Sequence, residues 1–246
     1  MALTVREALA QGKLYCAFQP IVDLTTGVNF GYESLARSDA PEFPNPGALF
    51  AAAIAEGMVG ELGRALRQMS VAKMPDARLF LNMHPDEFAE PWLVRPDDPA
   101  TLHDHDVYLE VTESVPLSHY RYCHSVLREM RGRGVKIAID DLGAGYSNLK
   151  YIADLQPEIV KLDRELIAGL QRGSPLHRLV KSIVRLCREM DARVVAEGIE
   201  TAAELRAVME AGVHYGQGYY IARPHREPPI VDWEDVRPAL TLGGKR

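Results

Sequence analysis

The sequence predicts an α/β protein folded as a (β/α)8, TIM-like barrel with one antiparallel strand at its start. Short apolar runs alternate with helical segments along the chain, and this alternation is typical of a parallel sheet. Seven of the runs end in or near a polar residue: Glu33, Asn82, Glu110, Asp140, Lys161, Glu197 and Gln217. In such a barrel the carboxyl ends of the strands meet at one mouth, where active sites are built.

The first two strands are expected to form a hairpin. Residues 14–24 and 28–35 are strand-like, and the Thr25-Thr26-Gly27 segment between them is typical of a turn. Pro20 lies inside the first strand and has no N–H for a sheet, so this strand is expected at an irregular or edge position. The later strands are expected in short apolar runs: 79–81, 107–109, 135–139, 159–160, 193–196 and 216–221.

The helices are indicated by the residue types at their ends. Asn45 and Pro46 are favoured where a helix begins, and Gly132 is favoured just past the end of one. The expected helices cover residues 46–56, 59–73, 118–131 with Ser118 as cap, 174–190 and 202–211. Segment 90–106 holds three prolines and is expected to be a long loop.

Length and composition limit the class of protein. We expect one domain over residues 1–246, with a core at about 14–224 and a C-terminal extension at 225–246, because single barrels commonly have this length. The formal net charge is −6, which argues against binding of duplex DNA or RNA through its phosphates. Three scattered cysteines, with no signal peptide or membrane segment, predict a cytoplasmic protein with reduced thiols.

Two adjacent carboxylates, Asp140 and Asp141, follow strand 135–139. Neighbouring like charges raise the cost of ionising each other, and divalent cations remove that cost. The alternative is a pair of solvated loop aspartates, which the pair by itself does not exclude.

The strand-end acids, together with Asn82, offer only oxygen ligands, so Mg²⁺ or Mn²⁺ is favoured over zinc. Five carboxylates can neutralise two such ions, and Asp140 is placed to bridge them. Two ions can clamp a phosphodiester and lower the pKa of a bound water. Lys161 would hold that water or offset excess negative charge; the alternative is a surface lysine. The expected reaction is metal-assisted phosphodiester hydrolysis.

Nine motifs extend this pattern over most of the chain. They are Phe18-Gln19-Pro20-Ile21-Val22-Asp23, Glu33-Ser34-Leu35 with Arg37, Leu81-Asn82, Glu110-Val111-Thr112-Glu113, Asp140-Asp141-Leu142-Gly143-Ala144-Gly145-Tyr146-Ser147, Lys161-Leu162-Asp163, Ala196-Glu197-Gly198-Ile199-Glu200, Gln217-Gly218-Tyr219 and Arg223-Pro224. From about Tyr15 to Pro224 the chain resembles the EAL family of cyclic di-GMP phosphodiesterases.

The resemblance implies hydrolysis of cyclic di-GMP to linear pGpG with two Mg²⁺ or Mn²⁺ ions per site. It implies one ion held by Glu33, Asn82, Glu110 and Asp140, and a second held by Asp140, Asp141 and Glu197. It implies catalytic roles for Glu33, Lys161, Glu197, Glu200 and Gln217, with Lys161 orienting the attacking water. It implies substrate contacts for Gln19, Leu35, Arg37, Asp163 and Pro224. Glu113 would steady the loop after Asp141, and a homodimer would form through about Leu142–Leu155.

Departures from the family pattern are few. Ser34 replaces the family's alanine and Leu142 its usual phenylalanine, but every implied metal ligand is present. This favours an active enzyme over two alternatives: a receptor that binds cyclic di-GMP without cleaving it, and a protein-interaction module with a vestigial pocket.

Three other features have ordinary alternatives. His103-Asp104-His105-Asp106 suggests a metal site, but histidines in such loops are more often solvated. Gly143-Ala144-Gly145 lacks the third glycine of a phosphate-binding loop, so a flexible turn is preferred. Glu113 and Glu200 are also acids of the kind that stabilise a helix start.

Overall fold

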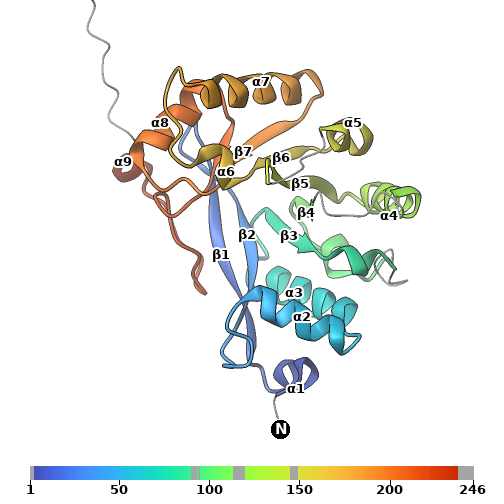
Figure 1. The fold of residues 1–246 in the computed structure, drawn as a ribbon. Coiled ribbons are helices and arrows are strands. Elements are labelled where there is room, and N and C mark those ends of the chain that lie inside the picture. Colours follow the sequence, from blue (N-terminus) through green and yellow to red (C-terminus); the bar gives the residue numbers. More distant parts are fainter. Residues whose placement is uncertain (1–2, 90–92, 94, 113–119, 145–148, 238–246) are drawn as a thin grey trace, which may run out of the picture.

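The computed structural model describes residues 3–89, 93, 95–112, 120–144 and 149–237 (Figure 1). Eight strands form a closed barrel in the order of the sequence. They are β1 Leu14–Asp23, β2 Asn29–Ser38, β3 Leu79–Met83, β4 Val107–Thr112, β5 Lys136–Leu142, β6 Ile159–Leu162, β7 Arg193–Ala196 and β8 Tyr215–Gly216. The predicted fold class is therefore confirmed.

Strand β1 runs antiparallel to both of its neighbours, β2 and β8, so the predicted hairpin and antiparallel start are confirmed. Pro20 lies opposite Tyr32, whose N–H donates away from β1 to Arg78 O. The nitrogen of Pro20 therefore faces the other edge of β1, where β8 pairs only with Val22 and Asp23. On the same edge His225 forms an antiparallel bridge with Phe18, so Pro20 lies between two short pairings, where its missing N–H is tolerated.

The helices lie around the outside of the barrel (Figure 1). They are α1 Val5–Ala10, α2 Pro46–Ala55, α3 Val59–Lys73, α4 Tyr120–Gly132, α5 Lys150–Leu155, α6 Arg164–Ile167, α7 Pro175–Glu189, α8 Ala202–Ala211 and α9 Trp233–Val236, with 3-10 turns η1 Pro85–Ala89 and η2 Pro99–Thr101. The five predicted helices are confirmed, and Asn45 Oδ1 caps α2 by accepting from Ala48 N at 2.9 Å. The expected cap Ser118 and residues 90–92 and 94 of the expected loop lie outside the described residues.

The last predicted strand, 216–221, is wrong in extent, because β8 holds only Tyr215 and Gly216. After Gln217 the chain turns, and Ile221 N and Ala222 N both donate to Gly218 O. A Cβ at Gly218 would lie 2.2 Å from Ile199 N. Gly218 thus packs directly on the backbone after β7, which diverts the chain from the sheet.

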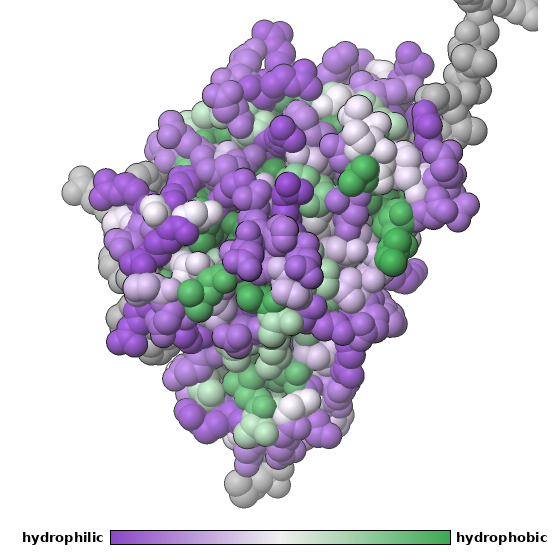
Figure 2. Space-filling view, turned by 180° about the vertical axis from the view of Figure 1, so that it is seen from behind, coloured by the Kyte–Doolittle hydropathy of each residue, from purple (hydrophilic) through white to green (hydrophobic). Residues whose placement is uncertain are grey.

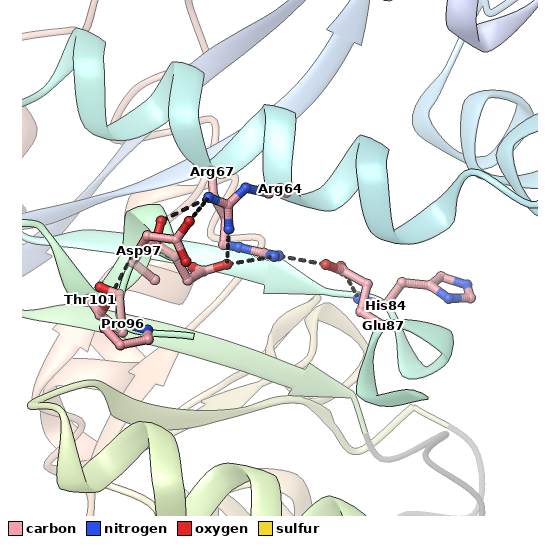
Figure 3. A network of polar contacts seen from close by, with 9 residues as sticks. Arg64, Arg67, His84, Glu87, Pro96, Asp97 and Thr101 are labelled. Carbon is pink, nitrogen blue, oxygen red and sulfur yellow. Dashed lines mark hydrogen bonds and ion pairs between the residues drawn. The ribbon is translucent and has the colours of Figure 1, made fainter. Parts of the chain in front are cut away.

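A buried ionic network joins α3 to the segment after β3. Arg67 donates to Glu87 Oε2 at 2.6 Å and contacts Asp98 Oδ2 at 3.3 Å (Figure 3). Glu87 Oε1 accepts from His84 N at 3.0 Å. All three charged side chains of the network are buried. The network therefore fixes the chain immediately after the strand end that carries Asn82.

Large apolar side chains that remain exposed are scattered over the described surface, among them Val28, Leu102 and Ile230. The face in Figure 2 is mostly hydrophilic, and its hydrophobic residues form separate small groups. Scattered exposed apolar residues are normal for a folded domain. Among the described residues no helix has both the length and the apolar character needed to cross a bilayer.

Candidate active site

The side chains inside the barrel include an apolar layer and a polar layer. The lower layer is a buried cluster that includes Phe80, Tyr108, Ala138, Ile159, Val195 and Tyr215. Two residues further along the chain from each of these stand Asn82, Glu110, Asp140, Lys161, Glu197 and Gln217. Because side chains two residues apart share one face of a strand, the polar layer rests on an apolar floor near the carboxyl ends of the strands.

Lys161, from β6, lies at the centre of the polar layer. Its Nζ lies 2.5 Å from Glu110 Oε1, 2.7 Å from Glu197 Oε1, 3.0 Å from Asp140 Oδ1 and 3.4 Å from Glu33 Oε2. Its side chain is 0% exposed, so the surface-lysine alternative is wrong. Burial lowers the pKa of this ammonium, but the four carboxylates together raise it well above its usual value, and Lys161 is charged.

Asp140 and Asp141 lie just before Leu142, the last residue of β5, at a break in the ladder with β6. The register shifts between Ile139 and Leu142, and Asp141 has a φ of 57°, in the left-handed region that few residues other than glycine adopt. A regular strand would point these two carboxylates to opposite faces. Instead, ligand oxygens of Asp140, Asp141 and Glu197 lie within 4.8 Å of one another. Asp140 is also buried, so the solvated-loop alternative is wrong.

Burial raises the pKa of three acids in this layer. For Glu110 burial is the largest cause, and the negative charge of Glu33 adds to it. The pKa of Glu197 is raised well above its usual value by burial and by neighbouring carboxylates. Burial and the charge of Asp140 raise the pKa of Asp141 to about 6. Perturbed acids gathered in one cleft are a mark of functional sites.

The acidic layer fits divalent cations. Within the described part of the chain, Glu110 Oε2 is buried without a hydrogen-bond partner. Glu110 Oε1 and Asp140 Oδ1 are also buried, and each has only its ion pair with Lys161. One ammonium cannot neutralise this number of acids. Mg²⁺ and Mn²⁺ prefer oxygen ligands, and they bind well where carboxylate oxygens outnumber the protein groups that could pair with them.

Amide side chains fix the orientation of Glu33, which projects from β2. Asn82 Nδ2 donates to Glu33 Oε1 at 3.3 Å, and Gln217 Nε2 donates to Glu33 Oε2 at 2.5 Å. Gln217 Nε2 also donates to Gln19 Oε1 at 2.9 Å, and Gln19 Nε2 donates to Ala222 O at 3.0 Å. These bonds link β1, β2, β3 and the segment after β8 at one point.

Ser34, the departure beside Glu33, has a partner in α3. Its Oγ lies 2.6 Å from Ser70 Oγ, and both side chains are buried. Ser70 Oγ also lies 2.7 Å from Leu66 O and 3.4 Å from Cys16 Sγ; with the Ser70 proton directed to Leu66 O, Ser34 donates to Ser70. The extra hydroxyl is therefore satisfied, as a buried polar group must be.

A pocket of about 240 Å³ adjoins the polar layer. The predicted site residues that line it are Gln19, Glu33, Leu35, Glu197, Glu200 and Gln217. Four further lining residues were not predicted: Arg164, Gly198, Gly218 and Tyr219. Gly198, Gly218 and Tyr219 lie inside two of the motifs quoted above but had no predicted role, and the only signal for Arg164 is that it directly follows Asp163.

Three residues expected to contact substrate do not line this pocket. Arg37 Nη1 donates to Ala36 O at 2.8 Å, and Asp163 caps α6 by accepting from Glu165 N at 2.7 Å. Pro224 is not among the residues that line the pocket either. Glu113 and residues 145–148 of the expected dimer segment lie outside the described residues.

The His103 motif is not joined to the acidic layer. His103 Nε2 lies 2.7 Å from Ala77 O, and its ring centroid is 6.0 Å from that of His105. The candidate metal group that the described residues form is Asp140, Asp141 and Glu197.

Fold and site together define the class: a TIM-type barrel with an acidic, lysine-centred layer that fits divalent cations at the carboxyl ends of its strands. The model of the EAL domain matches residues 2–224. The chain therefore belongs to the EAL domain family.

The similar proteins include cyclic di-GMP phosphodiesterases. The chain is 31% identical over 232 residues to the cyclic di-GMP phosphodiesterase PA2567 of Pseudomonas aeruginosa, a match that covers 89% of this chain and 40% of that protein. This chain spans less than half the length of several curated relatives that it matches.

Two solved structures support the comparison. The cyclic di-GMP complex of the MucR phosphodiesterase of P. aeruginosa has a TM-score of 0.79 and 29% identity, covering 90% of this chain and 95% of that one. The manganese and cyclic di-GMP complex of BlrP1 from Klebsiella pneumoniae has a TM-score of 0.74 and 30% identity, covering 87% and 56%.

Proposed function

We propose that this chain hydrolyses cyclic di-GMP to linear pGpG with the help of two divalent cations, Mg²⁺ or Mn²⁺. The observation that carries the proposal is the Lys161 ammonium within 3.4 Å of four carboxylates from four different strands or strand ends. Asp141 and Asn82 complete the acid and amide set beside it. A receptor or a vestigial module has no need to retain every one of these groups.

One ion would be held by Glu33, Asn82, Glu110 and Asp140, and the other by Asp140, Asp141 and Glu197. The close approach of the oxygens of Asp140, Asp141 and Glu197 supports the second set. Among the described residues Glu110 Oε2 is buried without a partner, and this supports the first set. When bound, two divalent cations stabilise the charge that develops on a phosphodiester and lower the pKa of the attacking water.

The remaining residues hold the substrate and the water. Lys161 would orient the attacking water, since its charged ammonium offers three N–H donors and its fully buried position fixes it in the acidic layer. Gln217 and Gln19 would keep Glu33 in its binding orientation. Leu35 would pack against the bound ligand, and Arg37 would contact a phosphate in exchange for its bond to Ala36 O.

Other roles depend on the same assignment. Glu113 would steady the loop after Asp141, and Glu200 would bind water at the pocket edge. We further propose a cytoplasmic homodimer that pairs through about Leu142–Leu155.

The direct test is product analysis. The purified chain is incubated with cyclic di-GMP and Mn²⁺ or Mg²⁺, with EDTA as control, and pGpG is measured by chromatography. We expect pGpG only with the metal. Binding of cyclic di-GMP without product would instead indicate a receptor, and absence of binding would indicate an interaction module; either result contradicts the proposal.

A further inference from the structure

Arg164 stands at the edge of the pocket and has no role in the proposed chemistry. It is the first residue of α6 and lines the pocket together with Glu200 and Tyr219. Its Nη2 lies 2.9 Å from Glu200 Oε1. No other contact of its guanidinium is found among the described residues, so some of its N–H groups can donate to a ligand.

The stem of Arg164 is held against the backbone that follows Glu197. A Cβ at Gly198 would lie 2.6 Å from Arg164 Cγ and 2.7 Å from its Cβ. Gly198 also has a φ of +63°, a conformation that glycine adopts without strain. A glycine at this position therefore allows the arginine to lie closely beside the pocket wall.

Exposure increases from the acidic layer toward Arg164. The side chains of Glu33 and Glu197 are 9% and 16% exposed, those of Glu200 and Arg164 40% and 58%. The reacting phosphate belongs with the buried carboxylates, because they form the cation site. The part of a cyclic dinucleotide that reaches Arg164 is therefore a group that flanks this phosphate.

The charge around Arg164 favours a neutral group over a second phosphate. The Glu200 carboxylate already balances the guanidinium, so the pair offers N–H donors with little net charge. Guanine presents two acceptors side by side, O6 and N7, which match the spacing of an arginine fork. We propose that Arg164 donates to O6 and N7 of one guanine of cyclic di-GMP and so determines base specificity; the inference rests on the function proposed above.

The test compares three cyclic dinucleotides whose phosphates are the same. Cyclic di-GMP and cyclic di-IMP both carry O6 and N7, whereas cyclic di-AMP carries an amino group in place of O6. Affinities are measured by calorimetry in Ca²⁺, and KM and kcat are measured in Mn²⁺, for the wild-type chain and for Arg164→Met and Arg164→Lys. Arg172→Met is the matched control, since Arg172 is exposed and pairs with Glu210 outside the pocket.

We expect Arg164→Met to weaken binding of cyclic di-GMP and cyclic di-IMP by about tenfold or more, with a raised KM and little change in kcat. Binding of cyclic di-AMP should stay unchanged, and Arg164→Lys should behave like Arg164→Met because lysine cannot bridge two acceptors. An equal loss for all three ligands, or affinity retained in Arg164→Lys, would assign Arg164 to a phosphate and overturn the inference. No change in either variant would also overturn it. A wild-type chain that binds none of the ligands would overturn the proposed function and this inference together.

Discussion

Lys161 Nζ lies 2.5 Å from Glu110 Oε1, and both side chains are fully buried. The pair joins β6 to β4 across the interior of the barrel, and the same ammonium reaches Asp140 and Glu197. Removal of one partner from a buried ion pair leaves an uncompensated charge. Lys161 should therefore stabilise the fold as well as act in the site.

The first prediction concerns Lys161→Met in the absence of metal. The variant should lose about 3–5 kcal/mol of unfolding free energy, measured by urea denaturation in EDTA. The double variant Lys161→Met, Glu110→Gln should recover part of this loss, because it buries one negative charge fewer. Equal stability of the single variant and the wild-type chain would mean that the carboxylates do not depend on this ammonium.

The second prediction concerns pH and metal. Burial and the charge of Asp140 raise the pKa of Asp141 from its ordinary value of 3.8 to about 6. At a pH between these two pKa values, the folded metal-free chain therefore binds more protons than the unfolded chain. Its stability should therefore fall as the pH rises toward and through 6. Cations bind the deprotonated form, so the rise in melting temperature produced by Mn²⁺ should increase between pH 5 and pH 7.

Thermal unfolding with and without Mn²⁺ checks this prediction. Asp141→Asn is the control, because it removes the titrating group and should flatten the pH dependence. A shift in melting temperature that is constant over this pH range would contradict the assignment of Asp141 as a cation ligand.

The third prediction concerns Ser34 and Ser70. Ser70→Ala leaves the buried Ser34 hydroxyl without an acceptor, and we expect it to cost about 1–3 kcal/mol. Ser34→Ala should cost less, because Ser70 keeps its bond to Leu66 O. In the Ser34→Ala background, Ser70→Ala should cost less than it does alone. Additive costs in this double-mutant cycle would mean that the two hydroxyls do not interact.

The fourth prediction concerns Gly63 in α3, beside the Arg67–Glu87 pair of Figure 3. A Cβ at Gly63 would lie 2.1 Å from Glu87 Oε2. Gly63→Ala should therefore destabilise the chain by about 1–3 kcal/mol, although alanine favours a helix by about 1 kcal/mol. Gly132→Ala is the control, because a Cβ there meets nothing within 4 Å. A melting temperature that rises in both variants would contradict the packing at Gly63.

The barrel and much of its polar layer could be predicted because both follow from simple periodicity. Alternating strands and helices indicate the barrel, and strand ends such as Glu110 and Lys161 must converge once the barrel closes. The floor beneath them follows from the same two-residue period, since Tyr108 and Ile159 precede these residues by two positions.

Features that depend on one unusual backbone conformation or on contacts between distant segments could not be predicted. Nothing in the sequence shows that Asp141 adopts a positive φ, which turns it toward Glu197. The run Tyr219-Tyr220-Ile221 has the composition of a strand, but the contact of Gly218 with Ile199 ends the sheet first. Arg164 resembles any exposed arginine that follows a strand, until its contact with Gly198 is known.

The most direct test of the central claim is the rate of pGpG formation by Glu33→Ala in Mn²⁺, compared with the wild-type chain. Glu33 is hydrogen-bonded to Asn82 and Gln217 and ion-paired with Lys161. We predict that the variant keeps its circular dichroism spectrum and loses turnover. A rate close to that of the wild-type chain would contradict the assignment of the acidic layer as the catalytic cation site.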